Sequence, residues 1–416
     1  MVIPRRLQAM APQFVRSSSS FEPPTGHTSF DARVADAVAA ALIPAREVIA
    51  SAEEIDYEAW DHVGDPLGEA LIADMRARNM MKGDLIANAR TLRDQGIRSA
   101  VDFLAEVEYV PSWLDFDELQ DGVDWAARNP IGFALGFHGA LPWSYLDSHT
   151  AAVFAATGRL RDGGDYSRRL FETARGFIST FDVEGMKPGG QQWETWVRVR
   201  LMHTMVRIGL QRSGKWTLDG VPVSSLSLGA GVFLFGWYRA AIAQWVAGPT
   251  SRREIESWMR MWQWVARLQG APVECIQSSL DVQRDIDARI LGLLYRPDAQ
   301  SKALVAANYR GLSETTGFRA LPLKAHEAIG WNLLKLPAST RYGGLRVPEE
   351  LGLRRHKLLT PIVAAMAAGL RFVHQVYRIP LVRRRAASAG IRFMAVFVER
   401  GLAGKDADFR THVLPG

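Results

Sequence analysis

The stretch Trp196-Val-Arg-Val-Arg-Leu-Met-His-Thr-Met-Val-Arg207 places one histidine, His203, among apolar residues at helical spacing. Arg200 lies three residues before this histidine, and Arg207 lies four residues after it. Residues three and four apart share one face of a helix. The pattern therefore predicts a helix whose face offers one imidazole nitrogen and two cations beside apolar side chains.

These three kinds of group are what a haem requires. An imidazole serves as the axial ligand of the iron, apolar side chains hold the porphyrin, and cations pair with the propionates. A second interpretation stays open, in which His203 is an ordinary core histidine and the arginines extend from a buried helix to water. The chain has no Cys-x-x-Cys-His attachment motif, so a haem here would be haem b, held by coordination and packing.

The composition is that of a globular protein, with 48% hydrophobic and 23% charged residues. Its 416 residues suffice for two or three average domains or for one large domain. The 13 tryptophans predict a large apolar cavity or interface, because an exposed indole is costly. The single cysteine, Cys275, excludes disulfides within the chain and cysteine-rich zinc or iron–sulfur sites, and we expect it in the core.

Apolar residues recur at a spacing of three to four along most of the chain, and alternating strand patterns are nearly absent. We therefore expect an all-α protein. The apolar block 131–158 should bend near Pro142, Ser112 or Asp115 should cap the helix that follows them, and Lys187-Pro-Gly-Gly190 should separate two helices. Besides the helix of His203, helical patterns cover 30–51, 65–92, 97–107, 167–181, 228–247, 251–269, 282–294, 301–312 and 325–334.

Four regions follow from these patterns. We predict a leader at 1–29, an N-terminal helical extension at 30–125, a core at 126–345 that contains the candidate haem site, and basic C-terminal helices at 346–416. The sequence does not indicate an oligomeric state.

The net charge of +6 is unevenly distributed. Leu353–Arg400 contains ten Lys and Arg and one acid, a local charge of +9 that leaves −3 for the rest of the chain. The basic residues flank the apolar runs Ile362–Leu370 and Phe393–Val398, which is typical of helices that lie on anionic membranes. The alternative is a helix pair packed on the protein with its arginines in water. Because the excess is confined to residues 353–400 and no reading motif accompanies it, we expect no nucleic-acid partner.

No secretory signal is visible, because Arg5-Arg6 is not followed by an apolar core of about 7–15 residues. The uncharged runs Asn129–Leu146 and Gly220–Tyr238 approach membrane-spanning length, but proline and polar residues interrupt both. We interpret both runs as buried elements. The expected location is therefore cytoplasmic or peripheral to a membrane.

Several segments occur in the order found in one oxygenase family. The most specific is Arg198-Val-Arg-Leu-Met-His-Thr-Met-Val-Arg207. Over roughly residues 110–300 the chain resembles the haem-b oxygenase family of latex-clearing protein, a rubber oxygenase, and of the fungal enzyme that shortens the farnesyl chain of mycophenolic acid. The remaining segments are Val110-Pro-Ser-Trp, Thr157-Gly-Arg-Leu, Arg168-Arg-Leu-Phe-Glu-Thr-Ala-Arg175, Pro188-Gly-Gly and Trp262-Gln-Trp-Val-Ala-Arg-Leu-Gln-Gly270.

The resemblance implies a globin-like helical core with additional N- and C-terminal helices. It also implies a dioxygenase that uses haem b and O2 to cleave carbon–carbon double bonds of hydrophobic, isoprenoid-like alkenes into carbonyl products. In that family His203 matches the axial ligand of the haem iron, and Arg207 matches the arginine one turn further on. Arg169 and Thr173 match a distal pair that shares one helix face and would stabilise negative charge on oxygen.

Two positions depart from the latex-clearing branch of this family. That branch has a lysine just before the distal threonine, where this chain has Glu172, and a glutamate some four turns before the distal arginine, where this chain has Val153. Glu172 is therefore a candidate catalytic acid or base, and the alternative is a structural ion pair with Arg169 or Arg175. The departures keep a second function open, a haem-binding helical sensor or scaffold without oxidative cleavage.

Overall fold

The computed structural model describes residues 56–156, 166–277, 279–338 and 346–402. Throughout these ranges the chain is helical, and the only β pairing is an isolated bridge between Asp147 and Arg296. The predicted all-α class is confirmed, while the expected leader and the helix at 30–51 lie outside the described residues.

The α-helices are α4 (Pro66–Ala77), α5 (Leu85–Asp94), α6 (Arg98–Glu108), α7 (Phe116–Ala127), α8 (Pro130–Ala134), α9 (Ala140–Ser144), α10 (Ser148–Ala156), α11 (Tyr166–Ser179), α12 (Gln191–Arg212), α13 (Ser225–Gly229), α14 (Tyr238–Val246), α15 (Arg252–Leu268), α16 (Leu280–Leu294), α17 (Ala299–Glu314), α18 (Leu323–Ala338), α19 (Val347–Glu350), α20 (Leu359–Val373) and α21 (Pro380–Leu402). Short 3-10 turns are η1 (Ala59–Asp61), η2 (Leu135–Phe137), η3 (Glu184–Met186), η5 (Val273–Cys275) and η6 (His374–Arg378), and η4 (Val232–Trp237) is a π-helix.

Most predicted helices end within a few residues of the observed ones, but two stretches were wrong. The pattern over 65–92 is two helices, because Asn79, just beyond the first helix, and Gly83, just before the second, adopt positive φ angles of 57° and 79°. Within the apolar block 131–158, the described residues 131–156 form a chain of short helices and not one bent helix. Of the two candidate caps, Asp115 caps α7 by accepting the Asp117 amide at 2.9 Å.

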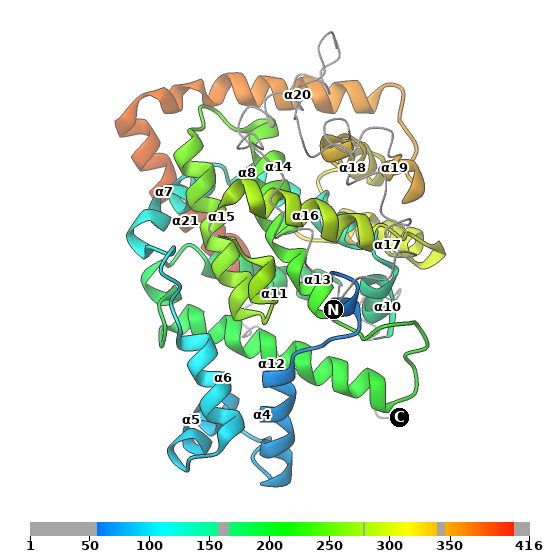
Figure 1. Ribbon diagram of the computed structural model, residues 1–416. Coiled ribbons are helices and arrows are strands. Elements are labelled where there is room, and N and C mark those ends of the chain that lie inside the picture. Colours follow the sequence, from blue (N-terminus) through cyan, green and yellow to red (C-terminus); the bar gives the residue numbers. More distant parts are fainter. Residues whose placement is uncertain (1–55, 157–165, 278, 339–345, 403–416) are drawn as a thin grey trace.

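Helix α12 divides the molecule, as Figure 1 shows: α4, α5 and α6 lie on one side of it and the main body lies on the other. Helix α15 carries the centre of the core, where it packs on α7, η4 and α12. Its tryptophans Trp258, Trp262 and Trp264 are almost fully buried. Cys275 is also buried, as expected.

Two described segments are long and apolar enough to cross a membrane, judged by length and composition alone. Ser225–Val246, which comprises α13, η4 and α14, is mostly buried, as predicted for the uncharged run Gly220–Tyr238 that it overlaps. Leu359–Arg378, which comprises α20 and η6, is mostly exposed. Helix α20 runs along the top edge of the molecule in Figure 1, where it packs on α14 and α18.

Candidate functional site

A cavity of about 430 Å³ lies among α11, α12, the η4–α14 segment, α15 and α16. This volume is within the range of small-molecule sites. Its walls are mainly apolar and aromatic, as the tryptophan count predicted. Wall residues include Phe137, Leu141, Trp143, Tyr145, Phe154, Phe177, Trp196, Val199, Met202, Val206, Leu228, Leu234, Phe235, Trp262, Val265 and Leu291.

Four predicted site residues line this one cavity. His203 comes from α12, and Arg169, Glu172 and Thr173 come from α11. Val153, which stands where the latex-clearing branch has a glutamate, also lines it. Residues far apart in sequence therefore meet at a single apolar space.

The Glu172 carboxylate is engaged by two arginines of its own helix. It accepts hydrogen bonds from Arg168 Nε at 2.9 Å and from Arg169 Nη1 at 3.1 Å. The Glu172 side chain is only 8% exposed, whereas those of Arg168 and Arg169 are 34% and 27% exposed. The ion pair with Arg169 that the sequence offered as an alternative is thus present, at the cavity wall.

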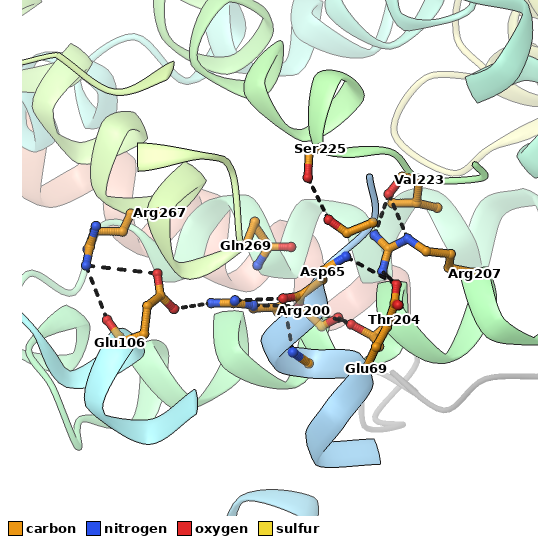
Figure 2. Close-up of polar contacts among 12 residues, drawn as sticks. Asp65, Glu69, Glu106, Arg200, Thr204, Arg207, Val223, Ser225, Arg267 and Gln269 are labelled. Atoms are coloured by element: carbon orange, nitrogen blue, oxygen red, sulfur yellow. Dashed lines mark hydrogen bonds and ion pairs between the residues drawn. The ribbon is translucent and has the colours of Figure 1, made fainter. Parts of the chain in front are cut away.

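Arg200 lies on the face of α12 that turns toward α4 and α6, away from the cavity. Its Nε and Nη2 each lie 2.8 Å from an oxygen of Asp65, the residue that caps α4, and its Nη1 contacts Glu106 (Figure 2). Thr204, one turn along, donates to Asp65 at 3.2 Å. Burial lowers the pKa of Arg200, but Asp65 and Glu106 outweigh burial and hold it above its usual value.

Arg207 belongs to the same face and holds two segments. Its Nη1 lies 3.3 Å from Oε1 of Glu69 on α4, and its Nε donates to the carbonyl oxygen of Val223 at 3.2 Å (Figure 2). The same Nε lies 3.1 Å from the carbonyl oxygen of Pro222. Val223 has a φ of 52°, which is costly for a β-branched residue. Because Val223 lines the cavity, Arg207 supports the cavity wall from behind.

Neither Arg200 nor Arg207 lines the cavity, and carboxylates and carbonyl oxygens occupy their guanidinium groups. Binding of a cofactor by these two residues stays a prediction, and their geometry instead supports a role in attaching α4 to α12. Spacing along a helix places residues within one turn of each other but does not reveal which neighbouring element each residue meets.

The sequence interpretation overlooked Arg239, a cation that does line the cavity. Arg239 is 3% exposed, and its guanidinium carbon lies 4.7 Å from the ring centre of Phe177 and 5.2 Å from that of Phe133. Burial lowers its pKa to about 9. The signal in the sequence was a lone charge inside Ser225–Val246, a 22-residue segment that is otherwise uncharged.

The donor set of the cavity fits a haem. His203 supplies an imidazole, the aromatic walls suit a porphyrin, and Arg239 and Arg169 supply positive charge. Several wall residues also have buried polar atoms that find no hydrogen-bond partner among the described residues, namely Nε of Arg239, Nε1 of Trp196 and Trp262, and Oη of Tyr145. A ligand that carries oxygen acceptors would satisfy such groups, since buried polar atoms are rarely left unpaired.

Comparison with known proteins gives a match in sequence and a match in fold. No family model matches the chain. Rubber oxygenase of Streptomyces sp. (strain K30) is 23% identical over 337 residues, which cover 77% of this chain and 77% of that protein. A solved structure of latex-clearing protein in its closed state matches with a TM-score of 0.56 and 17% identity, over 81% of this chain and 91% of that chain. The chain is therefore similar in sequence to a rubber oxygenase and similar in fold to a latex-clearing protein, in line with the resemblance of its ordered segments.

Proposed function

We propose that this chain is a haem-b-dependent oxygenase that uses O2 to cleave carbon–carbon double bonds of a hydrophobic, isoprenoid-like alkene, with carbonyl products. One observation carries the proposal: His203 of α12 and Arg169, Glu172 and Thr173 of α11 line the same apolar cavity. The relationship to a rubber oxygenase supports an oxygenase that acts on an apolar polymer or chain.

Haem b, held through His203, would supply the activation of dioxygen. The chain supplies the surroundings: Arg169 places positive charge at the wall, where it stabilises negative charge that develops on oxygen, and Thr173 adds a hydroxyl donor. The apolar walls exclude water and accept an alkene. By accepting from Arg168 and Arg169, Glu172 also fixes where the Arg169 guanidinium lies.

The two possible roles of Glu172 differ in a measurable way. In a Glu172→Gln variant, loss of an acid or base changes the pH profile of turnover, whereas loss of a positioning contact lowers turnover at every pH without changing the profile. Arg175, an exposed arginine of the same helix, provides a matched control as Arg175→Gln.

The assignment of His203 is tested by haem binding. The protein reconstituted with haem b should contain one haem per chain and show a Soret band, and His203→Ala should lose both. His62→Ala is the control, because His62 is exposed and does not line the cavity. A His203→Ala protein with an unshifted Soret band and full haem content would overturn the proposal.

A second candidate is a haem-binding protein without oxidative cleavage. Val153 is apolar where the latex-clearing branch has a carboxylate, and two arginines engage the Glu172 carboxylate. Oxygen consumption with squalene or oligomeric polyisoprene separates the two candidates. Uptake of O2 with carbonyl products supports the oxygenase, whereas a red protein that consumes no O2 with either alkene supports the second candidate.

A further inference from the structure

Arg239 differs from the other arginines buried in the described part of the chain for which partners are resolved. Arg128 pairs with Glu254 at 2.8 Å, Arg200 pairs with Asp65 and Glu106, and Arg207 pairs with Glu69. Arg239 forms no ion pair or hydrogen bond with any described residue, and its Nε atom is buried without a partner. It is therefore a cation inside the protein whose negative partner does not come from these parts of the chain.

The protein nevertheless holds this guanidinium in a defined place. The rings of Phe133, Phe137 and Phe177 surround it at 5.2, 5.9 and 4.7 Å, which offsets part of the cost of burying its charge. Gly136 leaves the space for it, because a Cβ atom there would overlap Nη1 of Arg239. A buried charge without a partner is costly, so its retention beside a cavity indicates an anionic ligand.

The rest of the cavity limits what that anion is. Phe177, on which Arg239 stacks, lies on α11 eight residues beyond Arg169, a separation of about 12 Å along the helix axis. Apart from Glu172 and Thr173, the cavity walls near them are mainly apolar. The anionic group therefore belongs to a largely apolar molecule that is charged at one end.

We propose that Arg239 binds a carboxylate of the molecule that occupies the cavity. This inference rests on the proposed function for the identity of that molecule, since the carboxylate belongs either to a propionate of haem or to an apolar unsaturated acid. A guanidinium suits either source, because it donates two parallel hydrogen bonds to the two oxygens of a carboxylate.

Paired probes identify the source of the carboxylate. Haem is compared with its dimethyl ester, followed by Soret absorbance, and oleic acid is compared with methyl oleate, followed by quenching of tryptophan fluorescence. The wild-type protein should bind the acid at least tenfold more tightly than the ester in one of the two pairs. Arg239→Met should abolish that preference, and Arg239→Lys should keep part of it. Equal acid-over-ester preferences in the wild-type protein and Arg239→Met would overturn the inference.

These measurements distinguish failure of the carboxylate site from failure of the proposed haem-dependent function. If neither haem nor its ester binds but the preference for oleic acid depends on Arg239, the carboxylate site stands and the haem assignment fails. If haem binds through His203 while no preference depends on Arg239, the haem assignment stands and the carboxylate site fails.

A second, independent observation concerns the C-terminal helices. Of the 17 large hydrophobic residues that are exposed in the described parts of the chain, ten lie between positions 358 and 396. Leu358 is 77% exposed, Met366 63% and Phe372 79%. Such a concentration of exposed apolar residues in one part of the chain indicates an interaction site.

The spacing of residues in helix α20 places its larger apolar side chains on the face turned away from the protein. Its small residues Thr360, Ala364 and Ala367 are buried on the side of α14 and α18, while Ile362 and Met366 face away from the protein. The usual arrangement of a surface helix, with apolar residues inward and polar residues outward, is thus reversed.

Positive charge flanks this apolar face at both ends. Arg354, Arg355 and Lys357 precede α20, and Arg378 and Arg383–Arg385 follow it, all of them exposed. The sequence before α20 packs on α18 through α19, and α21 packs back on α7 and α11. Both ends of α20 are therefore attached to one body, so the helix lies along the surface and does not cross a bilayer.

We infer that α20 and the start of α21 bind an anionic lipid surface, with the exposed residues of α20 among the headgroups and the flanking arginines on the lipid phosphates. Two features support this inference: the apolar residues of α20 face outward, and positive charge that complements anionic lipid lies at both ends of the helix.

Flotation of the full-length protein with phosphatidylcholine vesicles, with and without phosphatidylglycerol, tests the inference. The wild-type protein should float with the anionic vesicles, Met366→Glu/Phe372→Glu should lose most of this binding, and replacement of Arg383, Arg384 and Arg385 by Gln should weaken it several-fold. Leu218→Glu, at an exposed apolar residue elsewhere, should bind as the wild type does. Wild-type protein that fails to float, or sedimentation as a dimer that Met366→Glu/Phe372→Glu dissociates, would overturn the inference, the dimer in favour of a second copy of the chain.

Discussion

Buried arginines on the two sides of α12 differ in how their charge is compensated. On the side of α4, Arg200 is 3% exposed and is held by the carboxylates of Asp65 and Glu106. On the cavity side, Arg239 is equally buried, but aromatic rings surround it and no described carboxylate neutralises it. The difference teaches that burial of a charged residue does not by itself indicate a binding site, whereas burial beside a cavity without a partner does.

The largest expected change in the free energy of unfolding is on the side of α4, where Arg200 is ion-paired. Arg200→Met should lower the free energy of unfolding by about 3–5 kcal/mol, because the buried carboxylate of Asp65 would lose its ion-pair partner. Urea denaturation measures this. Arg198→Met on the same helix is the control, since its ion pairs with Asp84 and Glu194 are partly exposed and should contribute no more than about 1 kcal/mol. Equal losses in the two variants would contradict the comparison.

The buried histidines His138 and His326 show another way to bury basic side chains, which is to keep their imidazoles neutral. Nε2 of His138 lies 2.8 Å from Nδ1 of His326, with the rings stacked, and burial together with His326 lowers the pKa of His138 to about 3. Below the ordinary histidine pKa of about 6.5 the unfolded chain therefore binds a proton that the folded protein does not. Stability from this group is complete above that pH and is lost as the pH falls toward 3.

Between pH 6.5 and 5 this amounts to about 2 kcal/mol of unfolding free energy, at about 1.4 kcal/mol per pH unit. Urea denaturation at several pH values should show a shallower loss for His138→Gln than for the wild type. His62→Gln should follow the wild-type pH dependence, because His62 is exposed. Parallel curves for all three proteins would show that the histidine pair does not titrate as described.

The smallest expected change in the free energy of unfolding is on the cavity side of α12. In the protein without ligand, Arg239→Met should change the free energy of unfolding by no more than about 1 kcal/mol, because loss of the contacts with Phe133 and Phe177 is offset by removal of a buried charge. The same urea denaturation measures it, with Arg200→Met as reference. A loss as large as that of Arg200→Met would make Arg239 a structural residue.

Helical periodicity predicted the elements better than it predicted partners. The bounds of α11, α15 and α16 agree closely with the sequence patterns, because long amphipathic segments have few alternatives. His203, Arg169 and Thr173 were predicted from ordered motifs, and the structure brings them to one cavity. The role of Arg200 could not be predicted, because its partner Asp65 lies 135 residues away.

Arg239 was missed for a different reason. The uncharged run considered in the sequence ended at Tyr238, and Arg239 is the next residue. A lone charge within an otherwise apolar helix is a signal that single-sequence analysis can use, because burying it requires compensation. What the sequence could not show is that the compensation comes from Phe133, Phe137 and Phe177 and not from a carboxylate.

The π-helix η4 makes the number of residues between Leu228 and Arg239 structurally important. It lies between Leu228 and Arg239, both of which line the cavity, and its wider turn sets the angle between the two. Removal of a single residue from η4 would close its wide turn into an α-helical one and leave Leu228 and Arg239 near their relative orientation, because a π-turn holds about one residue more than an α-turn. Related sequences that keep this cavity should therefore lack a residue within 232–237 more often than they gain one.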